Sequence, residues 1–194
     1  MINLTPHKNK LTPTHMQSIT PKQSTYSLWL RPDQAQINKI TKIISELSHR
    51  FNSMPFPPHI SLLTSISADT TIITKACENI IAHHSVFNII LEQIGYTENY
   101  YRNLYILAKL DQPLINIYKA AKHQLNHKTQ ETFMPHISLH YGKLNGKKQQ
   151  SLKEKHDEHC PKIFSCRRLD LYCTTNKESE WYLVDSFNLS NNEP

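Results

Sequence analysis

The tetrapeptide His59-Ile60-Ser61-Leu62 occurs a second time, residue for residue, as His136-Ile137-Ser138-Leu139. Each copy follows a proline that ends a helix-like stretch, and each reads as a short β-strand. Side chains alternate between the two faces of a strand, so each copy presents a histidine and a serine on one face and two aliphatic side chains on the other. The repeat therefore predicts two equivalent strands, each with one polar face and one apolar face.

The flanking sequence repeats the same order of elements. A β-prone run at 26–30 precedes a helix that Asp33 would cap, and the prolines at 55–58 end that helix before the first copy. Apolar residues recur at helical spacing before each copy. Further helices are expected at 72–81 (capped by Asp69 or Thr70) and 114–125, a helix or loop at 143–155, and strands at 86–94, 104–110, 163–173 and 181–189.

The simplest fold with this order is an internally duplicated α+β protein. We expect two pseudo-symmetric lobes, each an antiparallel sheet with helices on its outer face, and a central cleft between them. Residues 25–190 would form this single two-lobed domain. The segment 1–24 contains no acidic residue and few apolar ones, which predicts a flexible polar leader, and 191–194 would be a short tail.

The composition excludes several classes of function. Only three glycines occur, so neither a Walker phosphate loop nor a G-x-G-x-x-G dinucleotide turn can be written. The formal net charge of +6 mildly favours anionic partners. The four cysteines form no C-x-x-C motif, and no stretch approaches the roughly 18 apolar residues of a membrane span. Because 1–24 also lacks a secretory signal pattern, we expect a cytoplasmic protein with no membrane partner. We also expect it to be a monomer.

The repeated strands carry the side chains for one kind of chemistry. If both polar faces line the cleft, it holds two imidazoles and two hydroxyls, and neither tetrapeptide contains a carboxylate. Hydrolysis of a phosphodiester needs a base for the attacking water, an acid for the leaving oxygen and donors for the other phosphate oxygens. Two histidines and two serines supply these groups, so no metal or other cofactor is expected.

With these motifs the chain resembles the two-histidine (2H) phosphoesterases, which carry paired His-x-Ser/Thr-x motifs on the strands of a two-lobed α+β fold. Over about 26–189, the residues Trp29 and Pro32 and the segments PPHISLL (57–63) and MPHISLHYG (134–142) look most like the cyclic phosphodiesterases of tRNA-splicing by-product metabolism. The resemblance implies hydrolysis of a 2′,3′-cyclic nucleotide or of ADP-ribose 1″,2″-cyclic phosphate to a phosphomonoester.

The same resemblance implies roles for five residues. His59 and His136 would be the acid/base pair, Ser61 and Ser138 would hold the phosphate oxygens, and Tyr141 would bind substrate as the aromatic residue after the second motif. The symmetry of the motifs leaves open which histidine activates water. We assign His136 to the water and His59 to the leaving oxygen.

Other substrates and another class of protein stay open. An RNA end, a 2′-5′ oligonucleotide or a cyclic oligonucleotide could replace the small cyclic phosphate, and a non-catalytic RNA-binding module would keep the histidines without turnover. The run Tyr100-Tyr101-Arg102 with Tyr105 could contact a base and a phosphate, or form only a hairpin turn.

The sequence offers three further features, which are His140, a cluster of histidines and cysteines, and a run of lysines. His140 is interpreted as a histidine at the rim of the cleft or in solvent. The cluster His156, His159, Cys160, Cys166 and Cys173 fits no standard zinc spacing, so its cysteines are expected to be small buried residues. The lysines at 143–155 are expected to form a solvated face that could also steer an anionic substrate.

Overall fold

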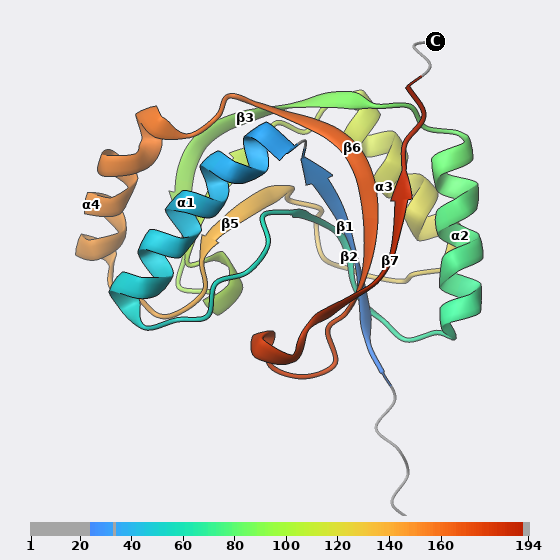
Figure 1. The fold of residues 1–194 in the computed structure, drawn as a ribbon, viewed down its shortest axis with the longest axis horizontal. Helices are drawn as coiled ribbons and strands as arrows, with labels where there is room; N and C mark the ends of the chain where they lie inside the picture. Colours follow the sequence, from blue (N-terminus) through green and yellow to red (C-terminus); the bar gives the residue numbers. More distant parts are fainter. Residues whose placement is uncertain (1–23, 33, 192–194) are drawn as a thin grey trace, which may run out of the picture.

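The computed structural model describes residues 24–32 and 34–191, which form four α-helices and seven β-strands (Figure 1). Nearly all of the predicted leader, the helix cap at Asp33 and most of the predicted tail lie outside the described residues. Within those ranges no helix is both long and apolar enough to cross a lipid bilayer.

The elements follow the order β-α-β-α-β twice. The first repeat is β1 (Tyr26–Pro32), α1 (Gln34–Phe51), β2 (Ile60–Ile66), α2 (Thr70–Ala82) and β3 (Phe87–Tyr96). The second is β4 (Leu104–Ala108), α3 (Gln112–Gln124), β5 (His136–His140), α4 (Gly146–His156) and β6 (Ile163–Cys173), and β7 (Tyr182–Asn188) follows it. The predicted internal duplication is therefore present, and the lysine-rich stretch is a helix rather than a loop.

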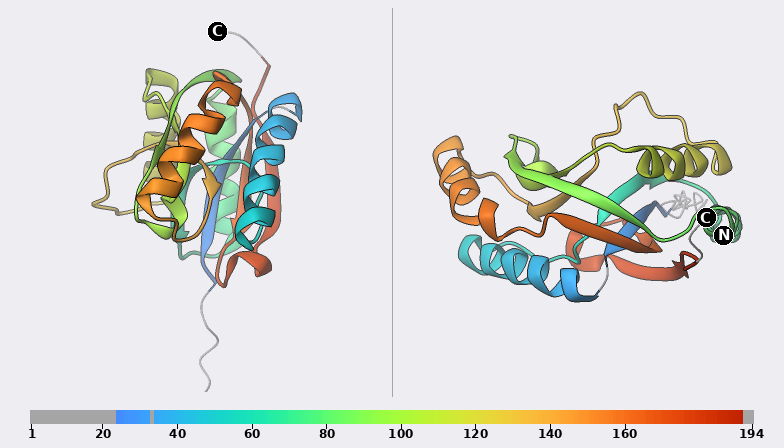
Figure 2. Two further views of the ribbon diagram at one scale, coloured as in Figure 1. Left: turned by 90° about the vertical axis from the view of Figure 1, so that its left-hand side faces the viewer. Right: turned by 90° about the horizontal axis from the view of Figure 1, so that it is seen from above.

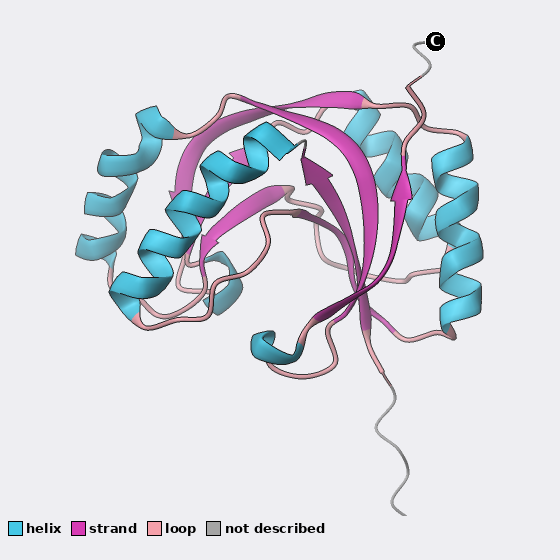
Figure 3. Ribbon diagram, viewed as in Figure 1, coloured by secondary structure: helices cyan, strands magenta, loops and turns pink. Residues whose placement is uncertain are grey.

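All seven strands belong to one antiparallel sheet, in the order β1-β2-β5-β4-β3-β6-β7, and β1 also pairs with β6 (Figure 3). The first residues of β6 pair with β3, and the rest of the strand pairs with β1 and β7. One half of the sheet is thus β2-β1-β6-β7 and the other is β5-β4-β3. The α+β class is confirmed, and the two halves share one curved sheet because β6 runs through both.

The helices lie in two pairs at opposite ends of the molecule (Figure 2). Helices α2 and α3 pack against each other and over β2, β6 and β7, whereas α1 packs on β5 and α4 on β3. An ion pair between Lys155 and Glu46 joins α4 to α1. Each repeat therefore covers strands of the other, α1 on β5 and α3 on β2, so neither repeat has a complete core of its own.

The apolar stripes expected from helical spacing form the core. In α1 the buried side chains include Ile40, Ile44 and Leu47, and in α3 they are Leu114, Ile117 and Ala121. From the repeated strands, the aliphatic residues Ile60, Leu62, Ile137 and Leu139 are all at most 2% exposed. The predicted alternation of faces is confirmed on this side of both strands. Their other side forms the candidate site.

Candidate active site

The two repeated motifs meet where the halves of the sheet join. Strands β2 and β5 pair through Ile60 and Ile137, the second residue of each motif. A cavity of about 270 Å³ is lined by His59 and Ser61, and one of about 310 Å³ by His136, Ser138 and again Ser61. Both cavities are lined by Ser61, Thr64, Tyr101 and Tyr141. They are two arms of one cleft, here named the His59 arm and the His136 arm.

Both histidines are fixed in the same way. Nδ1 of His59 donates to the carbonyl oxygen of Pro57 at 2.6 Å, and Nδ1 of His136 donates to that of Met134 at 2.8 Å. A proline separates each carbonyl from its histidine and restricts the backbone around it. Because a carbonyl only accepts, each Nδ1 carries the hydrogen. Each Nε2 is left without a hydrogen-bond partner among the described residues.

An aromatic side chain on the neighbouring strand orients each imidazole. The Trp29 ring stacks on His59 with the centroids 3.6 Å apart and the planes 8° apart, and on its other face it stacks on Tyr172. Tyr105 meets the His136 ring edge to face at 5.3 Å. Trp29 pairs with Ser61 across the strands, and Tyr105 pairs with Ser138. The two repeats therefore support their histidines from equivalent positions.

Burial makes both imidazoles weak bases. It lowers the pKa of His59 to about 3, against the hydrogen bond to Pro57, and the nearby charges of Arg31 and His136 lower it further. Burial also lowers the pKa of His136, and Arg102 adds to this effect. His59 is 5% exposed, whereas His136 is only half-buried. Both rings are therefore neutral near pH 7, and His59 is the more strongly held in that form.

The two motif serines are not equivalent. The hydroxyl of Ser61 faces both arms and has no hydrogen-bond partner in the described part of the chain. The Ser138 hydroxyl is buried and donates to the carbonyl oxygen of Tyr101 at 2.7 Å. It also forms a hydrogen bond with the Tyr141 phenol, whose pKa burial nevertheless raises. Ser61 is ready to donate to a ligand, whereas Ser138 must first leave its carbonyl partner.

A β-bulge places Tyr141 in the cleft. Leu104 pairs with His140 and Tyr105 with Ser138, so an extra residue of β5 lies opposite the β4 strand. Leu139 and His140 are then both buried, and Tyr141 reaches the cleft, where its ring stacks on Phe56 at 3.7 Å. The bulge thus ends the strict alternation of faces immediately after the second motif.

The expectation that His140 lies at the rim or in solvent is wrong. The residue is 2% exposed, its Nδ1 lies 3.3 Å from the Ser53 hydroxyl, and its ring lies against Phe51 at the end of α1. Burial lowers its pKa. The bulge turns the side chain away from the cleft face, which strand alternation alone does not predict.

The run Tyr100–Arg102 forms a short 3₁₀ turn (η1) between β3 and β4 and sits at the cleft. Tyr101 lines both arms and Arg102 lines the His136 arm. Trp181, which the sequence analysis did not single out, lines the His59 arm. An aromatic residue at the start of a strand is more often part of a core, so no sequence signal marked it.

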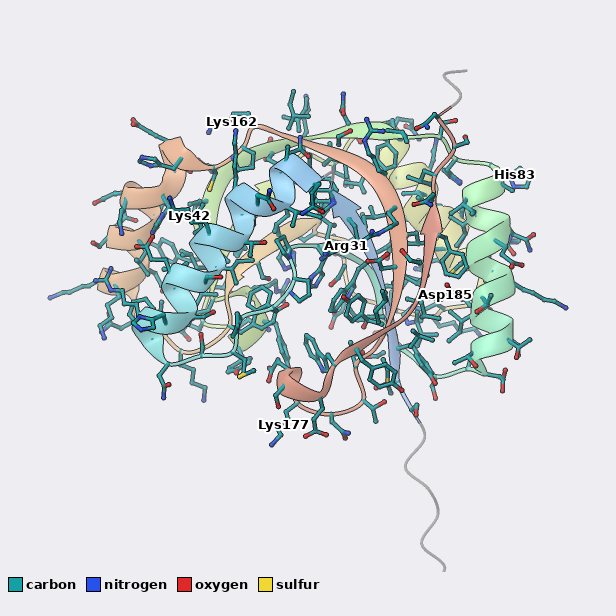
Figure 4. The ribbon with its side chains drawn as sticks, in the orientation of Figure 1. Arg31, Lys42, His83, Lys162, Lys177 and Asp185 are labelled. Carbon is teal, nitrogen blue, oxygen red and sulfur yellow. The ribbon has the colours of Figure 1, made fainter. Side chains whose placement is uncertain are left out.

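A buried charge network supports the backbone next to His59, and no sequence pattern predicted it. Arg31, 7% exposed, donates to the carbonyl oxygen of Pro58 and forms an ion pair with Asp170 at 3.3 Å. Asp170 also pairs with Arg168 at 2.8 Å and accepts from the Ser186 hydroxyl at 2.5 Å. Figure 4 shows Arg31 inside the molecule, whereas Lys42 and Lys162 point outward. A carboxylate within the apolar run at 169–171 was the available signal.

The cysteines behave as expected. All four are buried and unpaired, and burial raises the pKa of the Cys77 and Cys160 thiols to about 12. Within 24–32 and 34–191, no three His, Cys, Asp or Glu side chains come together as ligands of a metal ion would.

A duplicated α+β fold that brings two His-x-Ser-x strands to one cleft defines the class of the two-histidine phosphoesterases. Comparison with known proteins agrees: the cyclic phosphodiesterase-like protein family matches residues 24–189. The chain belongs to this family and is a phosphodiesterase.

Individual relatives are distant in sequence. A cyclic phosphodiesterase of Arabidopsis thaliana is 22% identical over 138 residues, which cover 69% of this chain and 74% of that protein. The crystal structure of E. coli LigT complexed with 3′-AMP has a TM-score of 0.53 at 11% identity, over 87% of this chain and 99% of that one. The crystal structure of TT0787 of Thermus thermophilus has a TM-score of 0.62 at 10% identity, over 87% and 100%. These two structures show a shared fold.

Proposed function

We propose that the protein hydrolyses a cyclic phosphodiester, a 2′,3′-cyclic nucleotide or ADP-ribose 1″,2″-cyclic phosphate, to a phosphomonoester without a metal ion. The observation that carries the proposal is the pair of imidazoles in one cleft, each with Nδ1 bound to a backbone carbonyl and Nε2 unpartnered. The relative from Arabidopsis thaliana is named a cyclic phosphodiesterase, which supports this substrate class. Ring strain also makes a cyclic ester easier to open than a linear one.

The two histidines would divide the proton transfers. One Nε2 takes a proton from water as the water oxygen attacks phosphorus, and the other Nε2 gives a proton to the ribose oxygen as its bond to phosphorus breaks. A base must be neutral beforehand and an acid must be protonated. Because His59 is the more deeply buried and the more strongly held neutral, we now assign His59 to the water and His136 to the leaving oxygen. This reverses the assignment made from the sequence.

The phosphate would lie in the part of the cleft common to both arms. Ser61 donates to a non-bridging oxygen directly, and Ser138 does so after turning from the Tyr101 carbonyl. Tyr141, stacked on Phe56, forms the wall beside them. Binding of the anion would raise the pKa of both imidazoles, because a nearby negative charge favours their protonated form. That shift prepares the acid for its proton transfer.

A longer nucleic acid is the second candidate. Besides the motif residues, the His136 arm is lined by Arg102 and by residues between 127 and 134, and this lining beyond the motif could contact an RNA end or an oligonucleotide. The chain would act as a monomer in the cytoplasm, where its four unpaired cysteines remain reduced. A non-catalytic RNA-binding module is the alternative from a different class of protein.

The function is tested by incubating the protein with adenosine 2′,3′-cyclic phosphate and EDTA and separating the products by chromatography. We expect adenosine monophosphate at an undiminished rate, because the two motifs supply acid, base and donors themselves. Binding without product would instead support the RNA-binding module. Loss of product with EDTA and its return with one divalent ion would contradict the proposed mechanism.

The assignment of acid and base is tested with a leaving group that needs no proton. 2′-O-Methyladenosine 3′-(4-nitrophenyl phosphate) has no free 2′-hydroxyl, so water is the nucleophile that displaces a stable phenolate. We expect His136→Asn to retain far more of the wild-type rate on this compound than on the cyclic phosphate, whereas His59→Asn stays impaired on both. The opposite pattern would restore His136 as the base.

A further inference from the structure

The two arms of the cleft differ in charge. The His59 arm is lined by hydroxyl and aromatic side chains besides His59 itself, and no Lys, Arg, Asp or Glu of the described residues lines it. The His136 arm is lined by Arg102, His127 and Glu131 in addition to His136. Each arm alone is near or below the lower end of the range of about 300–1,000 Å³ that is typical of ligand pockets. A substrate that fills both arms would place an uncharged group in the His59 arm and a charged group in the His136 arm.

Arg102 is the permanent positive charge of the His136 arm. The residue is half-buried, yet its guanidinium forms no hydrogen bond or ion pair with any side chain or carbonyl in the described part of the chain. Glu131 lines the same arm but is exposed and does not pair with it. Removing a charge from water without a partner costs free energy. The guanidinium therefore has its hydrogen-bond donors available for an anion in this arm.

The backbone of Arg102 is held firmly. Its carbonyl oxygen accepts from the backbone N–H and the hydroxyl of Thr97, at 3.2 and 2.8 Å, and its N–H donates to the Asn99 carbonyl at 3.1 Å. The buried Gln149 amide donates to the carbonyl oxygens of Thr97 and Asn103, at 2.8 and 2.9 Å. A turn closed by so many hydrogen bonds presents its side chain at a fixed place, which is what a specific binding residue needs.

Arg102 is not among the residues that line both arms, where the reacting phosphate would lie. That place is common to both arms and lies at Ser61 between the two histidines, whereas Arg102 lines the His136 arm alone. Its charge nevertheless acts on the His136 imidazole, so the two side chains are close. A guanidinium binds phosphate through two parallel hydrogen bonds. The anion at Arg102 would therefore be a second phosphate, just beyond His136.

We propose that Arg102 binds a second phosphate of the substrate, so that the preferred substrates are cyclic phosphates that carry a further phosphate group. The inference rests on the proposed function and narrows its substrate class. The second phosphate can be a terminal phosphate, a pyrophosphate or the linking phosphate of an oligonucleotide. All three present the same chemistry to the guanidinium.

The test compares adenosine 2′,3′-cyclic phosphate with the same compound bearing a 5′-phosphate, on the wild type, Arg102→Gln, Arg102→Lys and the control Arg167→Gln. Arg167 is an exposed arginine on β6 that lines neither arm. We expect the 5′-phosphate to raise wild-type kcat/KM at least about tenfold, the usual size of hydrogen bonds to a charged group. Arg102→Gln should abolish this advantage, chiefly through KM, Arg102→Lys should keep part of it, and Arg167→Gln should keep all of it.

The remaining substrates identify the source of the phosphate. ADP-ribose 1″,2″-cyclic phosphate and a dinucleotide ending in a 2′,3′-cyclic phosphate are measured on the same variants, and the largest loss in Arg102→Gln marks the preferred class. Equal losses on substrates with and without the second phosphate would overturn the inference, because Arg102 would then act on the reacting group. Hydrolysis of none of these compounds by the wild type would overturn the proposed function as well.

Discussion

At the scale of single residues, the site depends on how each imidazole is held. His59 stacks on Trp29, donates from Nδ1 to the Pro57 carbonyl and feels the charge of the buried Arg31, so Nε2 is its one nitrogen without a hydrogen-bond partner in the described residues. His136 has the same kind of backbone hydrogen bond, but its ring meets Tyr105 edge to face and is not stacked on an aromatic ring. Strand alternation, which is local, predicted that each histidine shares a strand face with its serine, and the repeat of the motif predicted that the two faces line one cleft. The sequence could not predict the unequal burial of the two histidines, which depends on Trp29 and Tyr172 from distant strands.

Acid should destabilise the fold partly through His59. Its pKa falls from 6.5 in the unfolded chain to about 3 in the folded protein, so between these values only the unfolded chain binds the proton. The stabilisation by neutral His59 is complete above pH 6.5 and is lost as the pH falls toward 3. Urea unfolding at pH 7.5 and pH 5 should therefore show a smaller loss of unfolding free energy in His59→Asn than in the wild type. Equal losses would contradict the pKa shift.

Ser61 and Ser138 should differ in their effect on turnover. Ser61 has a hydroxyl free to donate, whereas Ser138 is already bound to the Tyr101 carbonyl and supports η1. Ser61→Ala should therefore lower kcat strongly and change the melting temperature little. Ser138→Ala should lower the melting temperature more than Ser61→Ala does and should lower kcat less. Steady-state kinetics and thermal melts of both variants measure this. Equal effects of the two changes on kcat and on stability would show that the serines are equivalent.

At the scale of elements, the end of β5 links the core to the cleft. Gly142 has a φ of +154°, its N–H donates to the Tyr100 carbonyl at 3.0 Å, and a Cβ there would lie 2.6 Å from Nε2 of His140. The glycine thus allows β5 to turn toward η1 while His140 packs beneath it. The motif MPHISLHYG contains this glycine, but the sequence did not reveal that a bulge precedes it.

Gly142→Ala should destabilise the protein by about 1–3 kcal/mol, through backbone strain and the contact with His140. His140→Ala in the same chain removes the clashing ring. The double variant should therefore lose less stability than the sum of the two single variants, which denaturant titrations can measure. Full additivity would show that the strain lies in the backbone alone.

The buried ion pairs of Asp170 with Arg31 and Arg168 join β1 to β6. Asp170 faces both Arg31 and Arg168, and Arg31 in turn supports the Pro58 carbonyl before His59. Asp170→Asn should destabilise the fold by about 3–5 kcal/mol, because it leaves a buried guanidinium without its counter-charge. Ser186→Ala, which removes only a neutral donor to the same carboxylate, is the matched control and should cost about 2 kcal/mol. Similar losses in both variants would contradict a dominant role of the charge.

At the scale of the whole molecule, the duplicated order of elements was predictable from the repeated tetrapeptide, the prolines before it and the helical spacing between. That the two halves share one sheet was not predictable from these patterns. Whether β6 belongs to one half or crosses both depends on pairing between strands far apart in the chain, such as Tyr26 with Cys173 and Phe87 with Cys166. Local patterns give the faces of a strand, not its neighbours. The cleft exists because these distant pairings curve the sheet around the two motifs.

We propose that two imidazoles, one from each repeat, act together on one phosphodiester. The most direct measurement is kcat for adenosine 2′,3′-cyclic phosphate in His59→Asn and His136→Asn, alongside the melting temperature of each. Asparagine can still donate to the carbonyl that Nδ1 reaches, but it lacks Nε2. We predict that each change lowers kcat by about 10² or more in a folded protein. Turnover above about a tenth of the wild-type value in either folded variant would contradict the account.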